Sequence, residues 1–199
     1  SITNSRIYNF FSASLATQGI NIQANNNAWT INGNRIFQDA SRLYGAANLH
    51  RGIVLNSTAG GSFTISNNII GYASASGTGT YTMTHASGTG FAIRFFGMDI
   101  NCAASPASTV SNNEISGFSI TTSNTGTTTA ASFCGIWFNA GNATITGNTV
   151  GTMTGVDNIL VRTSGTGGAV TTPTLIGIGQ GAATAGIITI SNNNIGGLG

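Results

Sequence analysis

Charged side chains are the scarcest feature of this sequence, at 5% of its 199 residues, whereas about a quarter is usual in a globular domain. Lysine is absent, so all six cations are arginines, and the acids are Asp39, Asp99, Glu114 and Asp157. A formal net charge of +2 forms no basic stripe. We therefore expect no binding to the phosphates of nucleic acid.

The sequence also lacks the local motifs of common catalytic and cofactor sites. No GxSxG, HExxH, Walker or CxxC pattern occurs, and these patterns would mark nucleophile, zinc, phosphate or redox chemistry. With only His50 and His85 as histidines, the chain is short of metal ligands. No apolar run is long enough to cross a bilayer. We therefore expect no cofactor, no metal and no membrane span.

The residues that are abundant are typical of a β protein. Glycine (29 residues), serine, threonine and asparagine dominate, with only two prolines. Disordered chains usually have few β-branched residues and a high net charge, whereas isoleucine and threonine are plentiful here. A hydrophobic fraction of 40% is enough for one sizeable core. These features predict a single all-β domain over residues 1–199.

A six-residue motif occurs six times along the chain, as in repeat architectures. ITNSRI begins at Ile2, INGNRI at Ile31, ISNNII at Ile65, VSNNEI at Val110, ITGNTV at Ile145 and ISNNNI at Ile190. The steps between copies are 29, 34, 45, 35 and 45 residues. A constant motif with variable spacing indicates fixed strands joined by loops of different length.

The first and last positions of the motif are aliphatic, and the residue before the motif is polar. Its first position is always Ile or Val, and so is its sixth, at residues 7, 36, 70, 115, 150 and 195. A threonine precedes five copies: Thr30, Thr64, Thr109, Thr144 and Thr189. Apolar-in, polar-out alternation indicates a half-buried strand. We therefore predict that these threonines form an outward column.

The middle of the motif predicts a corner between two strands. Its third position is only Asn or Gly, at Asn4, Gly33, Asn67, Asn112, Gly147 and Asn192. Asn and Gly most readily accept a left-handed backbone. The fourth position is Asn in five copies: Asn34, Asn68, Asn113, Asn148 and Asn193. We predict that these amides form a ladder from coil to coil, as stacked asparagines do in cross-β assemblies.

A second recurrent pattern lies between the motif copies. It reads Ile-x-hydrophobic at Ile20/Ile22, Ile53/Leu55, Ile93/Phe95, Ile136/Phe138 and Ile176/Ile178. The remaining segment of a coil, for example residues 79–92, has room for a third strand and a loop. Parallel strands stacked from successive coils form a β-solenoid. The sequence therefore predicts a solenoid of about five coils, as a segment of a longer solenoid or as a unit that stacks end to end.

These columns resemble the right-handed parallel β-helix of the pectate-lyase-like superfamily. The stretches ITISNNNIGGLG (188–199) and TITGNTVGTMT (144–154) look most like repeats of large secreted surface proteins of gliding Bacteroidota. The resemblance implies the fold, but lyases, hydrolases, epimerases, phage spikes and adhesins share this scaffold.

The superfamily's enzymes act on acidic polysaccharides with clustered carboxylates. Asp39 and Glu114 follow motif copies two coils apart, which is about 10 Å of rise at the spacing of parallel strands. Asp99 and Asp157 lie in other segments. We therefore expect isolated acids, with Asp39 in a local ion pair with Arg42 or Arg35.

The two cysteines leave two alternatives open. Cys102 and Cys134 are 32 residues apart, close to the length of one coil. They are expected to form either a disulfide, as in exported proteins, or two stacked buried thiols.

The function favoured by these observations is a non-enzymatic extracellular or cell-surface module, a stiff stalk or filament unit. Its long loops, 71–92, 116–133 and 151–174, would contact a surface or neutral glycans. Its partners would be neighbouring β-helix segments or identical subunits end to end. One alternative is a polysaccharide lyase or hydrolase. A second is an ice-binding solenoid, because the threonine column and the Ser/Thr column two residues later form a regular hydroxyl face.

Overall fold

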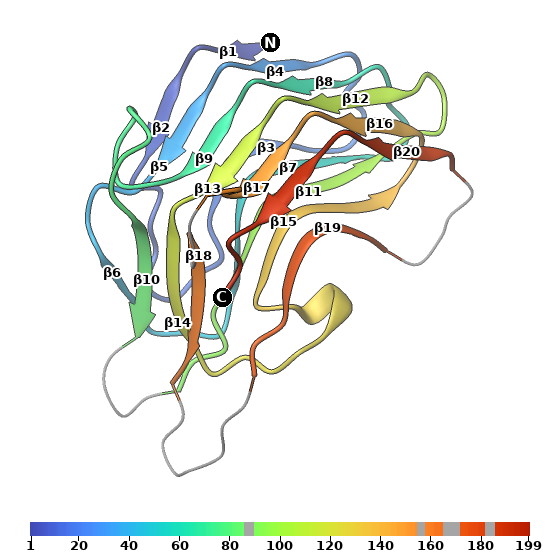
Figure 1. Ribbon diagram of the computed structural model, residues 1–199. Helices are drawn as coiled ribbons and strands as arrows, with labels where there is room; N and C mark the ends of the chain where they lie inside the picture. Colours follow the sequence, from blue (N-terminus) through green and yellow to red (C-terminus); the bar gives the residue numbers. More distant parts are fainter. Residues whose placement is uncertain (86–89, 155–157, 165–171, 182–185) are drawn as a thin grey trace.

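The computed structural model describes residues 1–85, 90–154, 158–164, 172–181 and 186–199. These residues form parallel strands in four sheets and a single 3-10 turn, η1 (Thr128–Ala130). Each strand pairs in parallel with the equivalent strand of the next coil, so the chain winds as a parallel β-helix (Figure 1). The predicted all-β solenoid is confirmed. It contains five turns of chain and the first two strands of a sixth.

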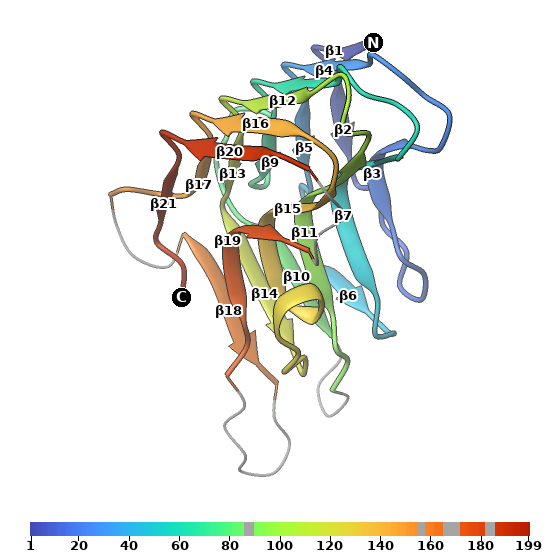
Figure 2. The same cartoon turned by 90° about the vertical axis from the view of Figure 1, so that its right-hand side faces the viewer.

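The motif supplies two six-stranded sheets. Sheet A contains β1 (Ile2–Thr3), β4 (Thr30–Asn32), β8 (Thr64–Ser66), β12 (Ser108–Ser111), β16 (Ala143–Thr146) and β20 (Ile188–Ser191). Sheet B contains β2 (Arg6–Tyr8), β5 (Arg35–Phe37), β9 (Ile69–Gly71), β13 (Glu114–Ser116), β17 (Thr149–Gly151) and β21 (Asn194–Gly196). Figure 2 shows the strands of sheet A following one another in chain order.

The segments between motif copies form the other two sheets. Sheet C contains β3 (Gln18–Ile22), β7 (Leu49–Ser57), β11 (Arg94–Cys102), β15 (Phe133–Ala140) and β19 (Leu175–Gln180). Sheet D contains β6 (Arg42–Tyr44), β10 (Tyr81–His85), β14 (Phe118–Thr122) and β18 (Ile159–Thr163). The loops expected as contact surface thus contain the strands β10, β14 and β18. The third strand expected within residues 79–92 is β10.

The motif copies are aligned residue for residue. Ile31, Ile65, Val110 and Ile145 pair in register in sheet A, and the sixth-position aliphatics do the same in sheet B. All of these side chains in the four middle copies are at most 1% exposed. They form one side of the core, because alternation turns each of them inward.

The corner between sheets A and B has the predicted backbone. All six third-position residues have positive φ, from 51° at Asn4 to 69° at Gly33. This left-handed conformation is uncommon for residues other than Gly and Asn. It explains why only these two residue types occur in the column.

The asparagine ladder is confirmed, and its hydrogen bonds explain how four of its five amides can be buried in a core. The Oδ1 atom of Asn113 accepts from the backbone N of Asn68 at 3.0 Å and from its Nδ2 at 2.9 Å. The Nδ2 atom of Asn113 donates to Asn148 Oδ1 and to the carbonyl of Ile65, both at 2.9 Å. The same bonds link Asn34 to Asn68 and Asn148 to Asn193. Because its donors and acceptors are hydrogen-bonded in this way, burying an amide side chain costs little free energy.

The predicted pattern between the motif copies was wrong in two coils. In sheet C, Ile20, Ile53 and Ile136 align with Met98 and Ile178. The third coil therefore uses Met98/Ile100 in place of Ile93/Phe95, and the fifth uses Ile178/Gln180 in place of Ile176/Ile178.

A glycine column in sheet C fixes this register. It consists of Gly19, Gly52, Gly97, Gly135 and Gly177, each directly before the aligned hydrophobic residue. A Cβ on Gly97 would lie 2.6 Å from the carbonyl oxygen of Gly135 and 2.9 Å from Cγ2 of Ile115. Sheet C thus approaches the aliphatic column of sheet B too closely for any side chain at this position.

Candidate functional site

The outer face of sheet C has an open groove of about 360 Å³. Its polar lining comes from four adjacent strands and from the residue that follows the first: Gln18, Gln23, Arg51, Asn56, Asp99, Asn101 and Asn139. We call this surface the sheet C groove. These side chains point outward because the inward positions of the same strands are the core residues Ile20, Leu55 and Ile100.

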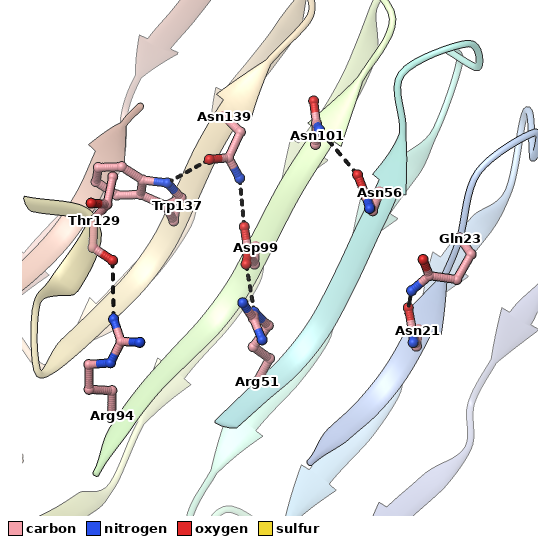
Figure 3. A network of polar contacts seen from close by, with 10 residues as sticks. All are labelled: Asn21, Gln23, Arg51, Asn56, Arg94, Asp99, Asn101, Thr129, Trp137 and Asn139. Carbon is pink, nitrogen blue, oxygen red and sulfur yellow. Dashed lines mark hydrogen bonds and ion pairs between the residues drawn. The ribbon is translucent and has the colours of Figure 1, made fainter. Parts of the chain in front are cut away.

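A chain of hydrogen bonds crosses three coils at this groove (Figure 3). Arg51 Nε donates to Asp99 Oδ2 at 2.6 Å, and Asn139 Nδ2 donates to Asp99 Oδ1 at 2.7 Å. The indole of Trp137 donates to Asn139 Oδ1 at 2.9 Å. The Arg51 and Asp99 side chains are 24% and 15% exposed, so water screens this ion pair less than it screens one on an open surface.

Asn139 reaches Asp99 because the strand is irregular there. The pairing of β11 with β15 shifts register between Ile100 and Asn101, and Asn139 is skipped. An extra residue of this kind re-aims its side chain. A second amide pair lies beside it, where Asn101 Nδ2 donates to Asn56 Oδ1 at 3.1 Å.

The groove has almost no free charge, because Arg51 and Asp99 neutralise each other. Their charges still act on neighbouring groups. Burial, and then Arg51, lowers the pKa of His50 to about 4. Burial, and then Asp99, raises the pKa of the Cys134 thiol. Both groups are therefore neutral at pH 7, and neither is poised as an acid or a nucleophile there.

The other half of the outer face of sheet C is apolar and shielded from solvent. Phe96 and Cys134 are 2% and 0% exposed, and they form a small cluster with Trp137. The turn η1 is bonded to this region, because Arg94 Nη1 donates to the Thr129 carbonyl at 3.3 Å (Figure 3). The outer face of sheet C is thus divided into a closed apolar half and an open amide-rich half.

The predicted threonine column exists, but it lies on sheet A, away from this groove. The five threonines pair in register from Thr30 to Thr189. Thr144 and Thr189 are exposed, and the other three are half-buried. The outward residues two positions later include Ser66, whose Oγ donates to Asn32 Oδ1 at 2.9 Å.

The disulfide alternative was wrong, because both cysteines are free and buried. They are not stacked thiols either, since Cys134 aligns with Phe96, and Cys102 aligns with Ser57 at the far end of β11. From β11 to β15 one coil is the 38 residues from Phe96 to Cys134, so a spacing of 32 residues does not bring two side chains together.

The three described carboxylates are separated by the fold. Asp39 lies 4.0 Å from Arg42, which confirms the local ion pair, and accepts from Asn9 Nδ2 at 2.7 Å. Asp99 is on sheet C, whereas Glu114 is on sheet B. Asp157 lies outside the described residues. Within the described ranges, no group of three or more His, Cys, Asp or Glu residues could hold a metal ion.

Comparison with known proteins gives no further lead, since no family model, curated protein or solved structure matches this chain. In the described part of the chain, no helix is long and apolar enough to cross a membrane.

Sequence reasoning missed Arg51, Asn139 and the whole sheet C groove. The signal that could have found them is the glycine column, since aligning the five glycines places Asp99 next to Val54 and Trp137.

Proposed function

We propose that this protein is a non-enzymatic extracellular module, a stiff β-helical stalk or adhesin that contacts neutral glycans through the sheet C groove. The observation that carries the proposal is the lining of that groove, in which amide side chains surround one neutralised Arg51–Asp99 pair. Amides that both donate and accept suit the hydroxyls of a neutral sugar chain. A uronic acid would need a free cation, and Arg51 is occupied.

Glycosidase chemistry needs a pair of carboxylates within about 10 Å of each other. Among the residues that the structure describes, Asp99 is the only acid that lines the groove. This supports the binding role over the alternative of a polysaccharide hydrolase. Lyase chemistry would require an unpaired basic residue beside the substrate, whereas the arginine in the groove donates to Asp99.

Glycan binding is tested by titrating the protein with neutral and uronic-acid oligosaccharides in a calorimeter. The exposed pair Gln23 and Asn56 is replaced by alanine, and Thr144→Ala on sheet A is the matched control. We expect the groove variant to bind a neutral glycan about tenfold more weakly, which is the loss of one or two hydrogen bonds, and the control to bind normally. Unsaturated or shortened products from any polymer would overturn the proposal in favour of a lyase or hydrolase.

The end-to-end partner is supported by apolar side chains on the last coil. Ile187, Ile190 and Ile195 are 75%, 51% and 46% exposed, although Ile190 and Ile195 belong to columns that are buried in the middle copies. A further coil from a neighbouring segment or an identical subunit would cover them. Sedimentation at rising concentration tests the second case, and a monomer at every concentration excludes identical subunits as the partner.

Ice binding is the second candidate, and the register of the threonine column favours it. Outward positions on sheet A repeat at about 4.8 Å between strands and about 6.7 Å along a strand. Thermal hysteresis near freezing that is lost in Thr144→Val would support this function. The absence of hysteresis in the unaltered protein would exclude it.

A further inference from the structure

Two arginines lie next to each other on the outer face of sheet B. Arg6 on β2 and Arg35 on β5 are register partners, and these two strands are neighbours in the sheet (Figure 1). Both side chains point outward, because the residues that follow them, Ile7 and Ile36, belong to the inward aliphatic column. Arg6 is exposed and Arg35 is half-buried. Since parallel strands are about 4.8 Å apart, two positive charges face solvent together.

Neither of these two guanidinium groups has a hydrogen bond or an ion pair within the described part of the chain. Three of the other four arginines do have partners there, namely Arg42, Arg51 and Arg94. The remaining one, Arg162, is exposed on sheet D, and its register partner is Thr121. Like charges directly opposite each other in a sheet are destabilising. An anion held between Arg6 and Arg35 would remove this repulsion.

The acids closest to this pair in the fold are bonded to other groups. The next residue in the register after Arg35 is Ile69, and Glu114 follows Ile69. Glu114 is thus two strands away from Arg35, about 10 Å at the spacing of parallel strands, and it accepts from the phenol of Tyr72 at 2.5 Å. Asp39 lies 4.0 Å from Arg42. The charges of the arginine pair are therefore not neutralised by these acids.

An aromatic pair continues the same outward face. Tyr8 and Phe37 are register partners two residues after the arginines, and their rings stack with centroids 4.9 Å apart and 6° between the planes. Phe37 is 8% exposed, whereas Tyr8 is 53% exposed. The Tyr8 side chain therefore lies open to solvent at about 6.7 Å from Arg6 along the strand. Its ring and hydroxyl can contact the body of a ligand whose anionic group lies between the arginines.

We propose that Arg6 and Arg35 together bind a phosphate monoester carried by a sugar, as in a phosphorylated glycan. Such an ester carries about two negative charges at pH 7 and three terminal oxygens. Its charge therefore matches the two arginines, and guanidinium groups bind phosphate oxygens through parallel N–H donors. A sulfate ester carries a single negative charge and would leave one arginine without a counter-charge. The sugar ring lies beside Tyr8, whose hydroxyl bonds to a sugar hydroxyl.

The test is an NMR titration that follows the Nε–H signals of the six arginines. The probes are glucose 6-phosphate, glucose, glucose 6-sulfate and inorganic phosphate. We expect glucose 6-phosphate to shift the signals of Arg6 and Arg35 but not that of Arg162, and glucose to shift none. Glucose 6-sulfate should bind about tenfold more weakly, the usual effect of losing a charged hydrogen bond.

Three results of this titration would contradict the proposal. Equal shifts at Arg162, or no shifts with glucose 6-phosphate, would overturn the site itself. Equal affinity for glucose 6-sulfate would overturn the match to a doubly charged ester. Equal affinity for inorganic phosphate would overturn the sugar part of the proposal.

Variants of the arginines separate binding from general effects on the fold. Arg6→Gln and Arg35→Gln each keep a polar side chain and remove one charge, and we expect each to weaken glucose 6-phosphate binding about tenfold. The double variant should show no measurable binding, with an unchanged or higher Tm because the repulsion between the two cations is gone. Arg162→Gln is the matched control and should bind normally. Unchanged affinity in the double variant contradicts the proposal.

Two further measurements define the source of the phosphate and the independence of the site. Phosphatidylcholine vesicles with and without phosphatidic acid present the same ester on a lipid, and we expect neither to bind. Binding to phosphatidic acid that the double variant loses would assign the site to a membrane surface and overturn the glycan part. The groove variant Gln23→Ala/Asn56→Ala should bind glucose 6-phosphate normally. Failure of neutral-glycan binding at the sheet C groove would thus leave this result unaffected.

Discussion

The corner between sheets A and B and the outer face of sheet C are built on opposite principles. The corner repeats the same few residue types in every coil, and the amides of its five asparagines are all hydrogen-bonded to neighbouring coils. The groove on sheet C depends on residues that occur once, such as Arg51 and the bulged Asn139. The stabilising contacts are therefore spread along the repeat, whereas the proposed binding groove lies where the repeat is broken.

The strongest test of this comparison is to remove one internal rung of the ladder. Asn113→Ala should lower the free energy of unfolding by about 3–5 kcal/mol, because it deletes a buried amide and leaves its partners without hydrogen bonds. Denaturant unfolding measures the loss. Asn193→Ala is the matched control at the half-buried end of the ladder, where water can replace the lost bonds. Equal losses at the two positions would mean that the ladder is not cooperative.

A pH titration of stability examines a buried group beside the groove. His50 is 1% exposed, and its Nδ1 lies 2.8 Å from Thr17 Oγ1. Its folded pKa of about 4 is below the ordinary value of 6.5, so the unfolded state binds more protons between these values. Stability should be complete above pH 6.5 and should fall by roughly 3 kcal/mol as the pH drops to 4. The slope should disappear in His50→Leu, and a slope that persists would assign it to other groups.

The glycine column offers a test of the close approach between sheets C and B. Gly97→Ala should cost about 1–3 kcal/mol, since the new methyl group overlaps the Gly135 carbonyl oxygen and Ile115. Gly45→Ala is the matched control, because its nearest contact would be an ordinary 3.6 Å to the Ala13 carbonyl oxygen. Thermal unfolding of the two variants gives the difference. A neutral Gly97→Ala would show that the two sheets can move apart.

The smallest effect on stability is expected from a substitution in the sheet C groove. Asp99→Asn removes the partner of Arg51 from a partly exposed site and should cost about 1 kcal/mol, since such pairs contribute little to stability. The same variant should change glycan affinity clearly. A stability loss as large as that of Asn113→Ala would show that the groove network is structural, and the contrast between the two regions would be lost.

The sequence alone predicted the parts of the fold that depend on short-range rules. Alternation placed the motif aliphatics inside, and the restriction to Asn and Gly located the corner at residues such as Asn67 and Gly147. Because these rules act within six residues and recur in six copies, each copy supports the others. The ladder followed from the same alignment.

The tertiary structure decided everything that depends on register between coils of unequal length. Because the motif copies are 29 to 45 residues apart, the sequence does not show which residues of successive coils become neighbours. For this reason the cysteine spacing gave a wrong prediction, and Ile93 was assigned to the wrong column. Only the folded chain brings Arg51, Asp99 and Asn139 together. The physical reason is that in a parallel sheet a side chain's neighbours are set by pairing across the coil, and a shift of a single residue exchanges the inner and outer faces.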